Sequence, residues 1–186
     1  MSTQLAIDTS TSRTSVALIV DGAVKWSEFE DGATAHAEAL PRLVQKALAI
    51  ENNIAQVIVG MGPGPYTGLR AGISFAQAFA WAREIELRGV CSLDAIVCTA
   101  PEYVVATDAR RKEIYWAAYK DGKRVDGPHV NLPTEVSAKV FVGEGAHKYG
   151  LSDVATYPNL SRFVHLVPVN QPMYLRRPDA VPTSER

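Results

Sequence analysis

The residues with the greatest potential for chemistry lie in a glycine-rich stretch, Gly62-Pro63-Gly64-Pro65-Tyr66-Thr67-Gly68-Leu69-Arg70. Glycine permits positive φ and close approach, proline restricts the alternatives, and Thr67 is predicted to cap a following helix. A loop that opens a helix in this way can bind an anion, so Gly62, Gly64, Thr67 and Arg70 are candidate anion-site residues. No Lys-Ser or Lys-Thr follows the last glycine, so this is not a Walker A loop. A turn whose glycines serve packing alone is the alternative.

Asp8 and Thr9, at the end of a predicted strand, form a second candidate site for a nucleotide. A carboxylate there can hold magnesium, provided that nearby loops let the backbone approach phosphates. The two hairpin loops expected to do so, 9–14 and 109–112, contain no glycine. A buried acid bonded to nearby backbone is therefore favoured for Asp8. We expect no cofactor in the isolated chain, and ATP or ADP only weakly or within a complex.

Histidine and cysteine provide no predicted metal or catalytic site. The four histidines, at positions 36, 129, 147 and 165, are scattered without ligand spacing, and His36 is interpreted as a surface or capping residue at a helix start. Cys91 and Cys98 match no zinc or redox spacing. We therefore expect no metal and no catalytic residue.

The basic residues of the chain form two short clusters, Arg110-Arg111-Lys112 and Arg176-Arg177, within a net charge of −1. Such a charge supplies no overall attraction to a phosphate backbone. Each cluster is too short to indicate a nucleic-acid site by itself, and a solvated loop is favoured.

The elements that must position these residues begin with a predicted three-stranded meander over 4–29 whose turn is Asp21-Gly22. An offset of 100 aligns Ala6, Asp8, Ala17, Asp21 and Gly22 with identical residues, so a strand–loop–strand–turn unit is predicted twice in one gapless register. Chance similarity between hairpins is the alternative. The first meander is followed by predicted helix 36–49, strand 56–60, helix 67–84 and strand 87–90. Strands alternating with helices predict an α/β fold with a mixed sheet.

The second half is predicted to be a reduced copy of the first. Val140–Gly143 resembles Val57–Gly60, but no long amphipathic helix precedes it. The predicted division is a first lobe over 1–98 and a second, trimmed lobe over 99–186. The tail 177–186 contains two prolines and no periodicity, so it is expected to fray.

The predicted helix from Leu69 to Ala82 is apolar nearly all round, because only Arg70, Ser74 and Gln77 are polar in it. Such a helix is expected to be buried on two sides, and small residues spaced four apart form a ridge for a neighbouring helix. We infer an intermolecular helix-bundle interface, with burial inside the same chain as the alternative. The predicted interface comprises His36, Leu40, Leu43, Val44, Ala47, Gly68, Leu69, Gly72, Ile73, Ala76 and Ala80.

Several blocks in order resemble the bacterial TsaB (YeaZ-like) family, which serves in tRNA threonylcarbamoyladenosine (t6A) biosynthesis. They are Ile7–Ser10, Gly62–Gly72, Gly89–Ala95, Asp108–Arg110 with Glu113–Trp116, and Pro172–Arg176. The resemblance implies the actin-like/Hsp70/sugar-kinase (ASKHA, RNase H-like) fold, with two related lobes. It also implies a non-catalytic paralogue of TsaD: a scaffold for the TsaD-like catalytic subunit that acts with a TsaE-like ATPase on adenosine 37 of tRNA.

Further expectations concern partners, location and the competing functions. The sequence does not distinguish a monomer from a homodimer for the free chain. Contact with tRNA is expected to be indirect, through the complex. The absence of a leader and of a membrane span predicts a cytoplasmic protein. Ser92 and Ile96 stand where the catalytic paralogue has its two metal-binding histidines, which argues against an M22-type metallopeptidase-like protein. An ATP-dependent phosphotransferase or ATPase of the actin-like fold is the other alternative. Pro65 stands where the family usually has serine, which weakens the anion-site hypothesis.

Overall fold

The first sheet contains the strands that the sequence predicted in the first half of the chain. The computed structural model describes residues 2–32 and 35–176. The strands are β1 (Thr3–Asp8), β2 (Arg13–Val20), β3 (Ala23–Asp31), β4 (Gln56–Gly60) and β5 (Glu86–Val90). Their order is β3-β2-β1-β4-β5, in which β1 to β3 form an antiparallel meander, β4 is parallel to β1, and β5 is parallel to β4. The predicted tail 177–186 lies outside the described residues.

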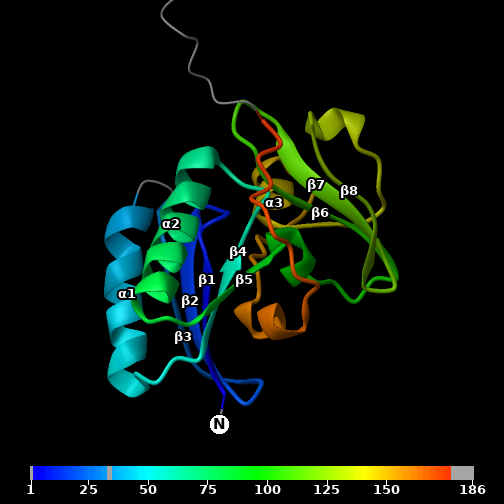
Figure 1. The fold of residues 1–186 in the computed structure, drawn as a ribbon. Coiled ribbons are helices and arrows are strands. Elements are labelled where there is room, and N and C mark those ends of the chain that lie inside the picture. The colour runs from blue at the N-terminus through cyan, green and yellow to red at the C-terminus, as the bar shows by residue number, and fades with distance from the viewer. Residues whose placement is uncertain (1, 33–34, 177–186) are drawn as a thin grey trace, which may run out of the picture.

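Two long helices, α1 (His36–Ile50) and α2 (Tyr66–Ala82), cover the same face of this sheet (Figure 1). Side chains alternate between the faces of a strand, so Leu5 and Ile7 of β1 point to the helices while Ala6 points away. The core on the helical side also contains Val16, Leu18, Leu40, Val44 and Leu69. The sequence pattern thus placed both helices correctly.

The opposite face of the first sheet is covered by chain that returns from the C-terminal part. Leu160 and Phe163, in the 3-10 helix η3 (Leu160–His165), pack in one cluster with Ala6, Ala17, Ile19 and Ile58. The backbone N–H of Val169 donates a 2.9 Å hydrogen bond to the carbonyl of Gly89 in β5. Residues 160–169 therefore pack on the first sheet, although the predicted second lobe included them. The boundary at 98/99 itself stays a prediction.

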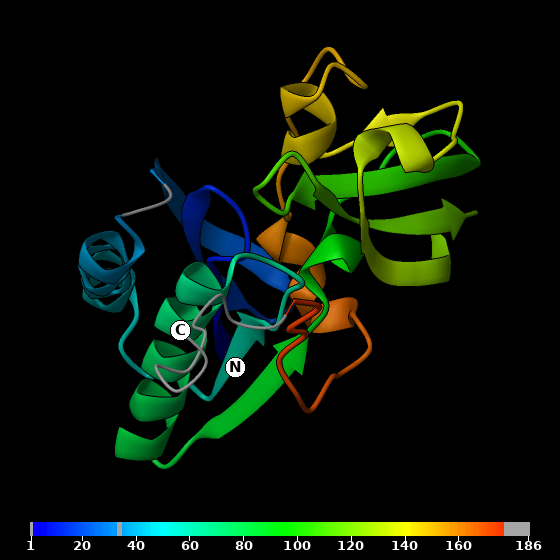
Figure 2. The ribbon, with the colours of Figure 1, turned by 90° about the horizontal axis from the view of Figure 1, so that it is seen from above.

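The second sheet is a shorter version of the first, and Figure 2 shows it beside the first sheet. Its strands are β6 (Glu102–Asp108), β7 (Ile114–Lys120), β8 (Lys123–Asn131) and β9 (Phe141–Val142), in the order β8-β7-β6-β9. β9 is parallel to β6 as β4 is to β1. Only the 3-10 helix η2 (Pro133–Glu135) lies between β8 and β9, and the short helix α3 (Glu144–Lys148) follows β9. The expected reduction of the second lobe is confirmed.

The strand–loop–strand–turn unit occurs twice, as predicted. Asp21 and Asp121 both have positive φ, 49° and 48°, each followed by a glycine of positive φ. Their N–H groups donate equivalent hydrogen bonds, to the carbonyls of Ser2 at 3.0 Å and Pro101 at 2.7 Å. Asp-Gly is typical of such hairpin turns because both residues tolerate the left-handed backbone.

The prediction of one gapless register for both units is wrong. In the first unit Ala6 pairs with Ala17, whereas in the second unit Ala106 pairs with Trp116. β6 is thus displaced by one residue, and the loop beyond the last pair, residues 109–113, is one residue shorter than 9–14. The physical consequence is a change of face, because a one-residue shift turns each side chain of a strand to the other side.

Candidate functional site

The glycine-rich stretch packs tightly against the start of the chain. A Cβ on Gly64 would lie 2.3 Å from the carbonyl oxygen of Ser10, and Gly62 has φ +93°. The carbonyl of Gly62 accepts a 2.8 Å hydrogen bond from the N–H of Ser92. The structural role that was the alternative for these glycines is therefore present: only glycine fits where the two backbones meet.

Asp8 is buried, and both its carboxylate oxygens accept hydrogen bonds from serines. Oδ1 accepts from the N–H and the hydroxyl of Ser10, at 2.9 and 2.7 Å, and Oδ2 accepts from the hydroxyl of Ser92 at 2.6 Å. Burial raises the pKa of Asp8, and the bonds from Ser92 and Ser10 oppose that rise. The favoured interpretation, a buried acid bonded to nearby backbone, is confirmed. Ser92, noted in the sequence only as a missing metal ligand, holds this carboxylate.

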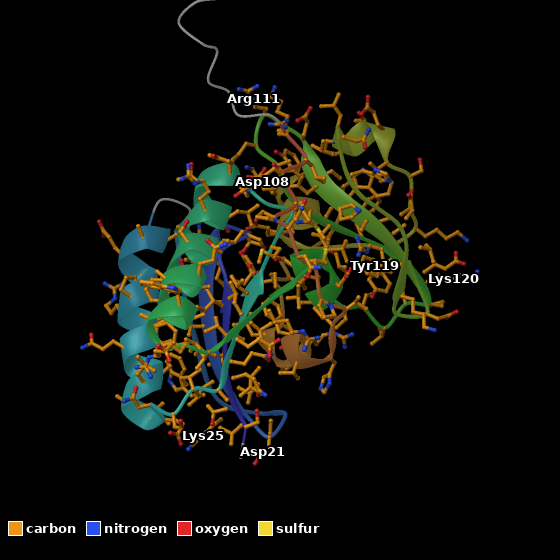
Figure 3. All side chains as sticks on the ribbon, viewed as in Figure 1. Asp21, Lys25, Asp108, Arg111, Tyr119 and Lys120 are labelled. Atoms are coloured by element: carbon orange, nitrogen blue, oxygen red, sulfur yellow. The ribbon has the colours of Figure 1, made fainter. Side chains whose placement is uncertain are left out.

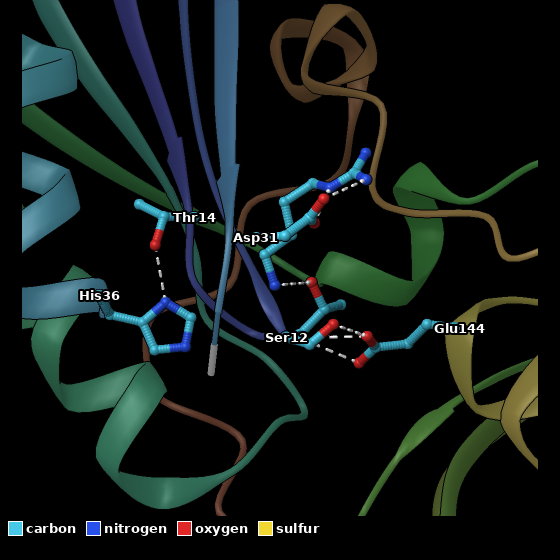
Figure 4. A network of polar contacts seen from close by, with 7 residues as sticks. Ser12, Thr14, Asp31, His36 and Glu144 are labelled. Carbon is cyan, nitrogen blue, oxygen red and sulfur yellow. Dashed lines mark hydrogen bonds and ion pairs between the residues drawn. The ribbon is translucent and has the colours of Figure 1, made fainter. Parts of the chain in front are cut away.

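Thr9 and His36 pack against two of the small residues of α2, Gly68 and Gly72. The Thr9 hydroxyl donates a 2.7 Å hydrogen bond to the Gly68 carbonyl, and a Cβ on Gly72 would lie 2.2 Å from Thr9 Oγ1. His36 is buried, and its Nδ1 lies 2.8 Å from Thr14 Oγ1 (Figure 4). Burial lowers the pKa of His36, and the charge of Arg110 lowers it further. The interpretation of His36 as a surface or capping residue is wrong, since α1 has no side-chain cap.

The predicted partner interface is wrong in its residues. The structure buries His36, Leu40, Leu43, Val44, Ala47, Gly68, Leu69, Gly72, Ile73, Ala76 and Ala80 inside the chain. They form the stripe by which α1 and α2 contact the first sheet and each other, which was the alternative. Within the chain α2 is buried on one side only, because Trp81 on the other side is 85% exposed; burial of that side by a second polypeptide stays a prediction.

The other face of α2 is available to a partner instead. Alongside Trp81, the face carries exposed Ser74 and Ala78, while the rings of Phe75 and Phe79 are half-buried and stacked 6.1 Å apart. Sequence spacing could not choose between the two faces, because both are apolar.

The candidate anion-site residues do not form one site. Asp8, Thr9, Gly62 and Gly64 are buried, whereas Thr67 and Arg70 are exposed at the start of α2. Thr67 does not cap the helix; the N-cap position is Pro65, which has no side chain to accept a bond. Arg70 Nη1 donates a 3.2 Å hydrogen bond to the hydroxyl of Tyr66 instead.

A contact between the two lobes was missed by sequence reasoning. The N–H of Ser12 lies 3.1 Å from both carboxylate oxygens of Glu144, and the Ser12 hydroxyl also donates to Glu144 (Figure 4). Burial raises the pKa of Glu144, and the Ser12 bonds lower it. The Glu144 carboxylate therefore occupies the first hairpin loop, 9–14, which is one of the two loops expected to contact phosphates if a nucleotide binds. Nothing local in the sequence signals this pair.

The second hairpin loop is held by Asp108. Asp108 Oδ1 accepts bonds from the N–H of Arg110 at 3.0 Å and the Tyr149 hydroxyl at 3.1 Å. Asp108 Oδ2 accepts a 2.6 Å bond from Lys148. The Asp108 carboxylate is thereby bonded to the start of the loop and to α3, and it fixes the loop in place.

Two further features, a metal-binding cluster and a membrane-spanning helix, are absent from the described residues. Residues 2–32 and 35–176 contain no group of three or more His, Cys, Asp and Glu side chains that could hold a metal ion. In the same part of the chain, no helix combines the length and apolarity that crossing a membrane requires.

Comparisons with known proteins address the family. A family model described as "TsaD: tRNA N6-adenosine threonylcarbamoyltransferase" matches residues 30–144, more than half of the chain. The structure of "YeaZ from Pseudomonas aeruginosa" superposes with a TM-score of 0.74 at 27% identity, covering 89% of this chain and 90% of that one. The Escherichia coli protein "tRNA threonylcarbamoyladenosine biosynthesis protein TsaB" is 36% identical over 62% of this chain and 54% of its own length.

The chain belongs to the TsaB (YeaZ-like) family. Its fold is the actin-like α/β fold with two related lobes. An uncharacterized Mycobacterium tuberculosis protein, Rv3421c, is 41% identical over 98% of this chain and 95% of its own length. An uncharacterized Mycobacterium leprae protein, ML0378, is 42% identical, but this chain covers only 57% of it. The chain thus spans little more than half the length of several curated relatives.

The sequence blocks typical of TsaB meet around the glycine-rich loop in this TsaB-family chain. The N–H of Met173 donates a 2.8 Å hydrogen bond to the Met61 carbonyl, and the ring of Tyr174 lies 5.1 Å from that of Tyr66. Gly62 receives its bond from Ser92, as described above. The segments around Ser92 and Met173 therefore both contact the glycine-rich loop between β4 and α2.

Proposed function

We propose that this chain is a non-catalytic scaffold subunit in the threonylcarbamoylation of adenosine 37 of tRNA. It would support a TsaD-like catalytic subunit, together with a TsaE-like ATPase, in the cytoplasm. Membership of the TsaB family supports this role, because its named relatives are tRNA threonylcarbamoyladenosine biosynthesis proteins.

The observation that carries the proposal is the unpartnered outer face of α2. Trp81 is 85% exposed, and Phe75 and Phe79 are half-buried beside it. Arg83 lies over the Phe79 ring at 4.7 Å, which places a charged group at the rim of an apolar centre. Exposed aromatic centres with polar rims are typical of protein–protein interfaces. This face replaces the buried stripe that the sequence indicated.

The hydrogen bonds around Asp8 and the first hairpin loop support a role without catalysis of its own. Both oxygens of Asp8 are engaged by Ser10 and Ser92, so this carboxylate would have to give up bonds to hold magnesium. The first hairpin loop already holds the Glu144 carboxylate through Ser12, and a nucleotide phosphate would be repelled there.

Co-purification with a TsaD-like protein tests the proposal. Trp81→Glu should weaken the pairing at least about tenfold, because it buries a charge in an apolar contact. Val125→Glu is the matched control: Val125 is 63% exposed on β8 of the second sheet, and its change should leave the pairing intact. Pairing that survives Trp81→Glu unchanged would contradict this interface, and failure of the wild type to pair would contradict the scaffold role.

Calorimetry with ATP and magnesium on the isolated chain tests the competing phosphotransferase function. The scaffold role predicts no tight saturable binding and no turnover. Turnover that disappears in Asp8→Asn would reverse the conclusion. The same preparation, analysed for stoichiometric zinc or iron, tests the metallopeptidase-like alternative.

A further inference from the structure

Arg176, from one of the two basic clusters of the sequence, lies beside the loop that contains the other cluster, Arg110-Arg111-Lys112. Arg176 forms an ion pair with Glu113, which ends the β6–β7 hairpin loop containing Arg110, Arg111 and Lys112. The Glu113 N–H donates to the Arg110 carbonyl at 2.9 Å, so this acid also closes the loop. Arg176 and the 110–112 loop, more than sixty residues apart in sequence, therefore contribute to one basic surface.

The backbone of this loop has an unusual conformation for its residue types. Arg110, Arg111 and Lys112 have φ of 62°, 51° and 64°, a left-handed region that long side chains disfavour. All three residues are exposed, and Figure 3 shows Arg111 at the outer end of the hairpin. Asparagine and glycine would adopt this backbone with less strain. The sequence instead carries three exposed cations in this loop.

The basic surface continues onto the first lobe through two tyrosines. The ring of Tyr174, two residues before Arg176, lies 5.1 Å from that of Tyr66 at the start of α2. The Arg70 guanidinium lies 5.4 Å from the centroid of the Tyr66 ring. Tyr66 and Tyr174 are 42% and 43% exposed, so each ring has a free portion among the cations. We call Arg70, Arg110, Arg111, Lys112, Lys148 and Arg176, with these two tyrosines, the basic ridge.

The charge of the basic ridge is opposite to that of the rest of the molecule. Its six cations are offset by three carboxylates that contact or adjoin them, Asp108, Glu113 and Glu144. The local net charge is therefore 6 − 3 = +3, and the whole-chain charge of −1 leaves −1 − 3 = −4 for the remainder. A positive patch on an acidic protein directs a polyanion to one place.

We propose that the basic ridge contacts the phosphate backbone of an RNA directly. This inference rests on the proposed function, which makes a tRNA the substrate of the complex. Arginine and lysine neutralise phosphates, and half-exposed tyrosines offer stacking faces to unpaired bases. We favour RNA over an acidic protein surface because RNA combines both matching chemistries, phosphates for the cations and base faces for the exposed tyrosine rings. The earlier expectation that tRNA is met only indirectly would then be replaced by direct contact.

The test compares two triple variants with the wild-type chain, alone and with its TsaD-like partner. Arg110→Asn/Arg111→Asn/Lys112→Asn removes three cations, and asparagine keeps the left-handed loop. Lys25→Asn/Lys123→Asn/Lys139→Asn removes the same charge from exposed positions outside the basic ridge. The probe is an unmodified fluorescent tRNA transcript, titrated by polarisation between 50 and 200 mM KCl.

The loop variant should bind the transcript at least about tenfold more weakly, and the slope of log K against log salt should become shallower by about two. The control should stay within about twofold of wild type. Equal affinities of the two variants, or no binding by the wild type in either form at 50 mM KCl, would overturn the inference. Loss of the protein partner with unchanged RNA affinity would also overturn it, in favour of an acidic protein contact.

Failure of the proposed function is recognised separately. Partner pairing is measured by co-purification of wild type and Trp81→Glu, whereas the transcript titration of the isolated chain needs no partner. A chain that binds RNA through the loop but never pairs would sustain this inference and contradict the scaffold role.

Discussion

Glu144, the first residue of α3, accepts hydrogen bonds from the N–H and hydroxyl of Ser12 in the first hairpin loop. This contact joins the two lobes across the place where an actin-like protein would be expected to hold phosphate. Glu144 is only 8% exposed, so the contact is shielded from solvent.

Removing this carboxylate should destabilise the chain. Glu144→Ala leaves the polar groups of Ser12 without their partner, and we expect a loss of about 1–3 kcal/mol in the free energy of unfolding. Urea denaturation followed by circular dichroism measures it. The exposed Asp153→Ala is the control and should change stability by less than about 0.5 kcal/mol. Equal effects of the two changes would mean that the lobes do not depend on this contact.

Asp8 should give the stability of the chain a specific pH dependence. Burial raises the pKa of Asp8 above its ordinary range, so ionisation is less favourable in the folded state than in the unfolded state. Its contribution is therefore complete below the unfolded pKa and is lost as pH rises through the folded pKa. Asp8→Asn should therefore gain stability relative to wild type as pH rises above the ordinary carboxyl pKa of about 4.

Urea titrations of wild type and Asp8→Asn at several pH values measure that difference. Asp153→Asn serves as the control for removing an exposed carboxylate. A difference between Asp8→Asn and wild type that stays flat, or that moves against the variant with rising pH, would contradict the assigned cause.

The small residues of α2 are required by contacts within the chain. A Cβ at Gly72 would lie 2.2 Å from Thr9 Oγ1. Gly72→Ala should therefore cost about 1–3 kcal/mol, although alanine is the better helix former. Adding Thr9→Ala should recover part of this loss, which a double-mutant cycle detects. Ser74→Ala on the exposed face is the control. A Gly72→Ala protein that is more stable than wild type would show that Thr9 does not pack closely against this position of α2.

The two cysteines should differ strongly in reactivity. Burial raises the pKa of Cys91 to about 12, and the charge of Asp94 adds to that rise. At pH 8 only about one Cys91 in ten thousand is then a thiolate, the reactive form. Cys98 is partly exposed, so iodoacetamide should modify it first. Mass spectrometry of the folded chain measures which cysteine is modified first. Full denaturation should abolish the difference in rate between Cys98 and Cys91. Equal modification rates in the folded chain would contradict the prediction.

Local patterns in the sequence determined most of the elements. Strand Gln56–Gly60 was predicted with its observed bounds, and the helix at His36 was one residue short at its end. The Asp-Gly turns at 21 and 121 marked both meanders, because turn conformation depends on adjacent residues alone. The glycine-rich loop was placed correctly between strand and helix for the same reason.

Tertiary structure alone decided which surfaces are free. In sequence, Leu69 and Trp81 both belong to an apolar helix, yet one is buried and the other is 85% exposed, because Thr9 and His36 pack against only one side of α2. The pairs Ser12–Glu144 and Arg176–Glu113 likewise join distant segments. Such contacts depend on how the chain returns to itself after β9, and neighbouring residues carry no information about that path.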